Sequence, residues 1–182
     1  MKYQLRIFLF LLSSVFLLTV VSCDQNTPPA DVFGDVIIKT ENGFKFQNID
    51  WMSKQAAIKE KVPKSSYNAE LSRLETQNKY EDEERKALYY LHEDQFYSGE
   101  YIIVFNTKSD YELYLSEIKE QAKEYFKDQQ PMSNSLDDLS YGQEVAWEGK
   151  DKSYFRIRCF EQEEKYTISF IVEAPKDMDF GA

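Results

Sequence analysis

The chain has 182 residues, with 22 basic and 32 acidic side chains and a formal net charge of −10. Such an acidic surface repels phosphate backbones, so we expect no nucleic-acid partner. Aromatic residues make up 15% of the chain and only six glycines are present, which indicates a folded protein with an aromatic core and excludes an intrinsically disordered one.

The first segment has the pattern of an export signal. Two cations precede an apolar run that extends from Ile7 to Val21 and has no equal later in the chain. A helix that crosses a membrane needs roughly 20 apolar residues, and this run is shorter. We therefore expect residues 1–22 to be a signal peptide that is removed.

The apolar run ends in Val20-Val21-Ser22-Cys23, which resembles the bacterial lipobox. The resemblance implies cleavage just before Cys23 and a diacylglyceryl group on its sulfur, since a thiolate is the nucleophile that accepts the lipid. More than one acyl chain is needed to hold a protein stably on a bilayer. The expected product is a cell-envelope lipoprotein, tethered on the outer side of the cytoplasmic membrane or in the outer membrane.

A short spacer and one domain are expected after the lipidated cysteine. Residues 24–31 contain two prolines and no large apolar side chain, which is typical of a flexible linker. Residues 32–182 are long enough for a single domain. Because Cys159 is the only other cysteine, no internal disulfide is expected if Cys23 carries lipid.

The domain is expected to begin with two strands and a short helix. The strands are predicted at Val32–Thr40 and Phe44–Ile49, with a turn at Glu41-Asn42-Gly43. Ser53 is the expected N-cap of a helix from Lys54 to Val62.

Residues 65–86 are predicted to form a second helix. Tyr67, Leu71 and Leu74 recur there at helical spacing. The acidic run 81–84 is interpreted as a solvated face, because it lacks the residue order of a calcium-binding loop.

An antiparallel pair and a third helix are expected next. The strands are predicted at 87–92 and 100–106, joined by a loop that contains Ser98-Gly99. The spacing of Ser109 and Glu112 predicts a capping box at the start of the helix. One stripe of this helix should be buried, and it comprises Tyr111, Leu115, Ile118, Ala122 and Tyr125.

Three further strands are predicted at 144–147, 153–161 and 165–173. In the last two, apolar residues alternate with Tyr154, Arg156 and Arg158 and with Thr167 and Ser169, so each should have one buried face and one wet face. The order of elements suggests two helix-then-strands units, 44–106 and 109–173. We therefore expect an α+β fold in which helices pack on an antiparallel sheet.

Three stretches resemble small bacterial envelope lipoproteins with β-lactamase-inhibitor-protein-like or outer-membrane-assembly small-lipoprotein folds. They are Phe46–Lys54, Phe96–Tyr101 and Val145–Trp147. The resemblance implies a helix layer on an antiparallel sheet whose free face or loops contact other proteins. It implies no catalytic residue.

Few residues have the spacing of a catalytic or metal site. His92 is the only histidine, and its neighbours Glu93 and Asp94 cannot all face one point from a strand, so no metal site is expected. Cys159 shares a face with apolar residues and is interpreted as an inert core thiol. Trp51 and Trp147 are interpreted as rings that lock a helix to the sheet, with ligand stacking as the alternative. We expect no enzyme activity and no cofactor.

The candidate interaction surface is the row Tyr154, Arg156 and Arg158 on the wet face of one strand. Tyrosine and arginine are enriched where proteins bind each other. The alternative is an ordinary wet face whose charges are balanced by Glu161 and Glu173. The functional prediction is a non-enzymatic envelope protein that binds another protein as an inhibitor, assembly factor or accessory factor. A second hypothesis, a small-molecule or peptide binding lipoprotein, requires an aromatic pocket near Trp147 and Tyr154.

Overall fold

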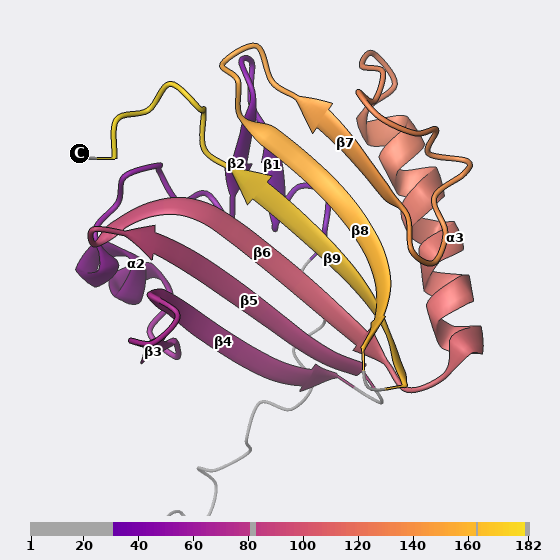
Figure 1. The fold of residues 1–182 in the computed structure, drawn as a ribbon, viewed down its shortest axis with the longest axis horizontal. Coiled ribbons are helices and arrows are strands. Elements are labelled where there is room, and N and C mark those ends of the chain that lie inside the picture. Colours follow the sequence, from indigo (N-terminus) through magenta and orange to yellow (C-terminus); the bar gives the residue numbers. More distant parts are fainter. Residues whose placement is uncertain (1–30, 81–82, 163, 181–182) are drawn as a thin grey trace, which may run out of the picture.

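The computed structural model describes residues 31–80, 83–162 and 164–180 (Figure 1). The chain is built around a seven-stranded antiparallel sheet with the order β3-β4-β5-β6-β9-β8-β7, and β1 and β2 form a separate hairpin. The strands are β1 Ile37–Lys39, β2 Phe44–Phe46, β3 Ser66–Asn68, β4 Arg73–Tyr80, β5 Glu83–His92, β6 Gln95–Phe105, β7 Glu144–Glu148, β8 Tyr154–Gln162 and β9 Lys165–Glu173. The helices are α2 Gln55–Lys61 and α3 Lys108–Tyr125. The predicted signal peptide, Cys23 and most of the predicted spacer lie outside the described residues.

The expected α+β fold with a helix layer on the sheet is wrong. Of the described residues, 44% lie in strands or bridges and 17% in helices, so the fold is dominated by its sheet. The helices of the two expected units also differ, because α2 has 7 residues and α3 has 18. Strands from both units join in one continuous sheet through the pairing of β6 with β9.

The predicted helix at 65–86 is the main source of this error. The segment forms β3, β4 and the start of β5, and β4 pairs with β5 from Arg73–Tyr90 to Tyr80–Glu83. Of the three residues that suggested a helix, only Leu74 is buried, whereas Leu71 is 52% exposed. The apparent helical stripe therefore does not exist in space.

Both predicted helix caps are also wrong, although the helices themselves are confirmed. Lys54 occupies the N-cap of α2 without a side-chain hydrogen bond. The hydroxyl of Ser53 instead donates to the Asp50 carbonyl oxygen at 2.6 Å. At α3 the N-cap is Thr107, whose hydroxyl accepts from the Asp110 backbone nitrogen at 3.2 Å. The helix therefore begins one residue before Ser109.

The expected loop at Ser98-Gly99 lies within β6. The β5–β6 turn is made by Glu93 and Asp94, both in the left-handed region with φ of 47° and 67°. Gly99 is required by packing, since a Cβ there would lie 2.2 Å from Cγ of Phe46. Removal of that side chain lets the β1–β2 hairpin lie directly on the sheet.

One face of the sheet carries the core. The hairpin supplies Phe44 and Phe46 to it, and α3 contacts both β6 and β9. The predicted stripe of α3 is confirmed at Tyr111, Leu115, Ile118 and Ala122, and Tyr125 is partly buried. The predicted alternation of β8 is also confirmed, because Phe155, Ile157 and Cys159 are at most 1% exposed.

Neither described helix lies over the opposite face of the sheet, which Figure 1 shows in front. The expectation that all outward residues of β9 are wet is nevertheless wrong, since Thr167 and Ser169 are 3% and 0% exposed. They sit in the middle of the sheet beside longer side chains such as Arg158 and Phe160, which shield them. Within the described ranges, no helix is long and apolar enough to cross a membrane.

Candidate functional site

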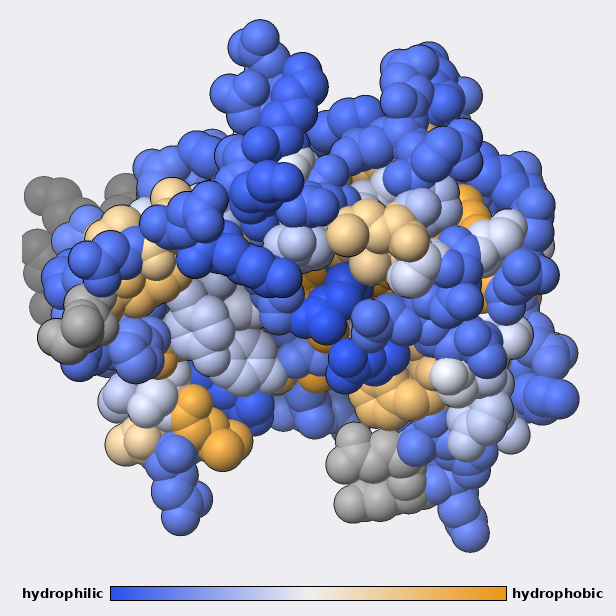
Figure 2. All heavy atoms as spheres, turned by 45° about the horizontal axis from the view of Figure 1, so that its top comes forward, coloured by the Kyte–Doolittle hydropathy of each residue, from blue (hydrophilic) through white to orange (hydrophobic). Residues whose placement is uncertain are grey.

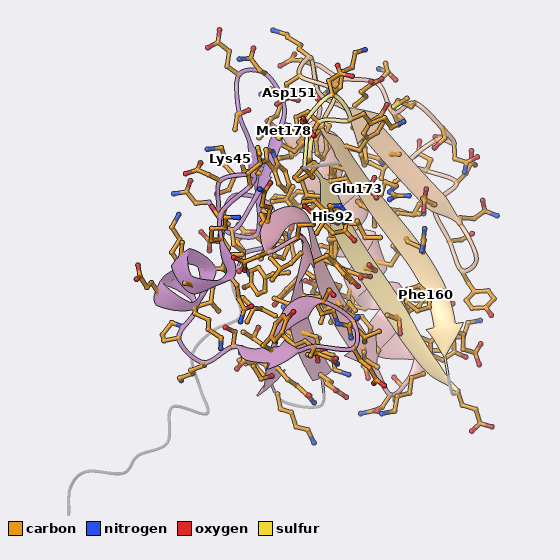
Figure 3. All side chains as sticks on the ribbon, turned by 60° about the vertical axis from the view of Figure 1, so that its left-hand side comes forward. Lys45, His92, Asp151, Phe160, Glu173 and Met178 are labelled. Carbon is orange, nitrogen blue, oxygen red and sulfur yellow. The ribbon has the colours of Figure 1, made fainter. Side chains whose placement is uncertain are left out.

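The candidate site is the face of the large sheet opposite the core, called the open face below. Side chains alternate between the two faces along a strand. The open face therefore consists of every second residue of the strands β3 to β9, namely those on the same side of the sheet as Arg156. Glu173 and Phe160 mark opposite ends of the β8–β9 pair (Figure 3). Viewed at a 45° tilt, the surface is mostly hydrophilic, and its hydrophobic side chains form small separate patches (Figure 2).

The three predicted interaction residues lie together on this face and are held by carboxylates from the two neighbouring strands. Arg156 forms a short ion pair with Glu173 of β9. Arg158 binds Glu144 of β7 through Nη2 and Nε, both at 2.9 Å. The hydroxyl of Tyr154 donates to the Glu148 carboxylate at 2.9 Å. All three side chains therefore have a partner on a neighbouring strand.

The balancing charges differ from those expected. Glu173 does pair with Arg156, but Glu161 has the same alternation as Phe155 and lies on the other side of the sheet. Glu144 is a further partner, which only the β7–β8 register places opposite Arg158. A single arginine row thus becomes a two-sided ion-pair network.

A second polar group on the open face was missed by sequence reasoning. Glu100 of β6 accepts from the Tyr90 hydroxyl at 2.7 Å and from the Ser169 hydroxyl at 2.5 Å. Arg73 of β4 lies over the Tyr90 ring, 5.5 Å from its centroid, and pairs with Glu75 at 2.7 Å. Residues 65–86 were predicted to form a helix, and only the registers of β4 with β5 and of β5 with β6 bring Arg73, Tyr90 and Glu100 together.

The contacts of the open face change the pKa values of its ionisable groups. Burial, followed by the hydrogen bond to Glu100, raises the pKa of Tyr90. The hydrogen bond from Arg73 lowers the pKa of Glu75. Lys86 and Tyr154 act in the same way on the pKa values of Glu84 and Glu148. These shifts favour the ionised form of Glu75, Glu84 and Glu148 and the neutral form of the Tyr90 phenol.

The open face is electrically balanced although the chain is strongly acidic. Its cations are Arg73, Lys79, Lys86, Arg156, Arg158 and Lys165, and its carboxylates are Glu75, Glu84, Glu100, Glu144, Glu148 and Glu173. Six charges of each sign give this face a net charge of zero, against −10 for the whole chain. The excess negative charge therefore lies elsewhere on the protein.

The remaining candidate residues are separated from one another. His92 is exposed at the end of β5, beside the β5–β6 turn (Figure 3). Cys159 is buried, and burial raises the pKa of its thiol to about 11. No group of three His, Cys, Asp or Glu side chains that could hold a metal ion occurs in the part of the chain that the structure describes. Cys23, the predicted lipidation residue, lies outside that part.

The two tryptophans both pack against aromatic rings. Trp51 stacks on Phe96 at 5.1 Å, and Trp147 forms a mutually stacked cluster with Phe126 and Phe155, at 4.3 and 5.4 Å from their centroids. Trp147 is on the core side of β7, whereas Tyr154 is on the open face. Trp147 and Tyr154 therefore face opposite sides of the sheet, and the small-ligand hypothesis stays a prediction.

Comparison of the chain with models of protein families, with curated proteins and with solved structures found no match in any of the three. The resemblance to small envelope lipoproteins stays a prediction.

Proposed function

We propose that the chain is a lipid-anchored, non-enzymatic protein of the bacterial envelope that binds another envelope protein through the open face. The anchor is proposed from the leader and from the lipobox-like sequence that ends at Cys23. The observation that carries the binding proposal is the zero net charge of the open face on a chain of net charge −10.

A neutral face of this kind suits a protein partner. Like-charged macromolecules repel each other, so an acidic partner can approach closely only where the local charge is balanced. The side chains of the open face are also pre-ordered, which lowers the entropy lost on binding. Arg158 is 47% exposed and its pair with Glu144 is partly solvated, so a partner carboxylate can replace that pair at small cost.

The expected partner is therefore a folded protein surface with both signs of charge. Its carboxylates would meet Arg156 and Arg158, and a cation would meet Glu144. The tyrosines of the open face would supply contact area with few rotatable bonds.

Site-specific photo-crosslinking in the native envelope tests the proposal. A photoreactive amino acid is placed at Arg158 on the open face and, as a control, at Leu113 of α3, which is 65% exposed. We expect a covalent adduct of one defined mass from position 158 and none of that mass from position 113. Equal adducts from both positions, or none from position 158, would contradict the proposal.

A pair of charge-reversal variants gives an independent readout. The double variant Arg156→Glu, Arg158→Glu carries no photoreactive residue and is used to capture the partner that crosslinking identifies. It should abolish that capture, because it leaves Glu144 and Glu173 beside new negative charges. Lys59→Glu with Lys64→Glu changes the net charge by the same amount at exposed sites away from the open face and should leave capture intact. Circular dichroism on both variants separates lost binding from lost folding.

A further inference from the structure

The segment that follows β9 contacts one end of the open face. It comprises residues 174–180, called the strap below, and it leaves the end of β9 toward the side of β6 (Figure 1). The Ala174 backbone nitrogen donates to the Tyr97 carbonyl oxygen of β6 at 2.9 Å. The Met178 backbone nitrogen donates to the Pro175 carbonyl oxygen at 3.1 Å, which forms a turn within the strap itself. The strap thus starts on the sheet and then continues as a surface turn.

Tyr97 reaches the open face through a bulge in β6. Tyr90 of β5 pairs with Ser98. The next pair is Leu91 with Phe96, so Tyr97 is an extra residue in β6. A bulge changes the direction of the side chain that it carries. The Tyr97 ring accordingly lies beside that of Tyr90, with 6.4 Å between their centroids, and 38% of Tyr97 is exposed.

The strap places one side chain on Tyr97 and one on Tyr154, which are called the tyrosine pair below. The Lys176 ammonium lies over the Tyr154 ring, 4.5 Å from its centroid. The Phe180 ring meets the Tyr97 ring edge to face at 6.2 Å. Glu148 accepts the Tyr154 hydroxyl at 2.9 Å, so a carboxylate lies next to the ring that carries the ammonium. One tyrosine therefore favours a cation, and the other favours the edge of an aromatic ring.

The contacts between the strap and the tyrosine pair are exchangeable. Lys176 is exposed and Phe180 is partly exposed. A cation over a ring and a pair of rings each contribute little at such sites. A segment that is joined to its own surface nevertheless has an effective concentration in the millimolar range, so weak contacts keep it closed. A partner segment that makes additional contacts on the open face can then replace it.

We propose that the tyrosine pair is a docking surface for a partner segment with a cation and an aromatic ring, and that the strap covers it until that segment replaces it. Lys176 and Phe180 show the chemistry that this surface accepts, and Glu148 selects a cation over a neutral group. The inference rests on the proposed function, because it gives the partner of the open face a further contact. Displacement of the strap uncovers both tyrosines and enlarges the open face.

Peptide binding tests the docking surface without the partner. The probe is the acetylated and amidated peptide of residues 176–180, added to the detergent-solubilised full chain with or without Lys176→Ala and Phe180→Ala. Ring ¹³C labels on tyrosine give the readout, and Tyr97→Phe and Tyr154→Phe assign the two signals. In the double variant we expect a saturable shift of both signals with a Kd of about 1 mM. The unchanged chain should bind at least about threefold more weakly, because its own strap competes.

Altered peptides and a distant tyrosine are the controls. Replacement of either the lysine or the phenylalanine of the peptide by alanine should weaken binding at least about threefold. The signal of Tyr67, which is 42% exposed on β3, should not move. The proposal is overturned by no saturable shift up to about 20 mM, by equal binding of the alanine peptides, or by equal binding to the two chains. A double variant that circular dichroism shows to be unfolded also overturns it, since the strap would then be part of the core.

Capture of the partner connects the docking surface to the proposed function. With the photoreactive amino acid at position 158, the variant Lys176→Ala, Phe180→Ala should raise the yield of the partner adduct at least about twofold, because the tyrosine pair is uncovered. An adduct with unchanged yield overturns the strap as a cover. Peptide binding without any adduct from position 158 contradicts the proposed function alone, so the two failures are distinguishable.

Discussion

Substitution of Gly99 by alanine tests how the β1–β2 hairpin is held on the sheet. The new Cβ would lie 2.2 and 2.3 Å from Cγ and Cδ1 of Phe46, well inside van der Waals contact. Phe46 is fully buried against Tyr89 and Phe96, so its ring has little room to move. Overpacking of this kind costs about 1–3 kcal/mol. In a chain of this size, that loss corresponds to a melting temperature lower by about 2–12 °C.

A double-mutant cycle with Phe46→Leu separates this clash from a general loss of β6 stability. Phe46→Leu alone should destabilise the protein, because it removes buried ring surface. In the double variant the smaller side chain makes room for the alanine Cβ. The loss of unfolding free energy in the double variant should therefore be about 1 kcal/mol smaller than the sum of the two single losses. Urea unfolding followed by circular dichroism measures all three variants. If Gly99→Ala is neutral, or if the two losses are simply additive, the packing argument is refuted.

Three further predictions concern the core thiol, the cap of α3 and the effect of acid. In a Cys23→Ser variant the thiol of Cys159 should not react with Ellman's reagent at pH 8 until the protein is unfolded, because burial raises its pKa to about 11; rapid reaction of the native protein would contradict this. Thr107→Ala should lower the free energy of unfolding by about 1 kcal/mol in thermal unfolding because it removes the cap, whereas Ser109→Ala should be nearly neutral. A larger loss for Ser109→Ala than for Thr107→Ala would contradict this and would support a cap at Ser109. The pKa values of Glu75, Glu84 and Glu148 are lowered in the folded state, so the stability they provide is present above their unfolded pKa of about 4.3 and is lost as pH falls through the folded values. Urea unfolding at pH 7 and at about pH 3 should show this loss, and Glu75→Gln should reduce it.

The elements that were predicted correctly have a clear periodic pattern of apolar and polar residues. The residues 154–159 alternate between apolar and polar, and the buried stripe of α3 repeats at helical spacing, so burial alone fixes the type of element. Residues 73–80 lack such contrast. Leu74 is the only fully buried side chain in β4, because this strand lies near the sheet edge and its residues Gln77–Lys79 are exposed. Periodicity carries little information for a strand that is wet on both faces.

The candidate site was predicted in part for a similar reason. Alternation within β8 is a local property, so it placed Tyr154, Arg156 and Arg158 on one face. Their partners Glu144 and Glu173 come from other strands, and only the register between strands brings them within reach.

The order of the strands has a consequence for the kinetics of folding. Most neighbours in the sheet are joined by local hairpins, so β3 to β6 and β7 to β9 can each form with short loops. The pairing of β6 with β9 is different, because it joins Ser98 to Glu173 across α3 and the whole second set of strands. Closing such a long loop is slow relative to hairpin formation. We therefore expect the seam between β6 and β9 to form last, with the two blocks of strands already in place.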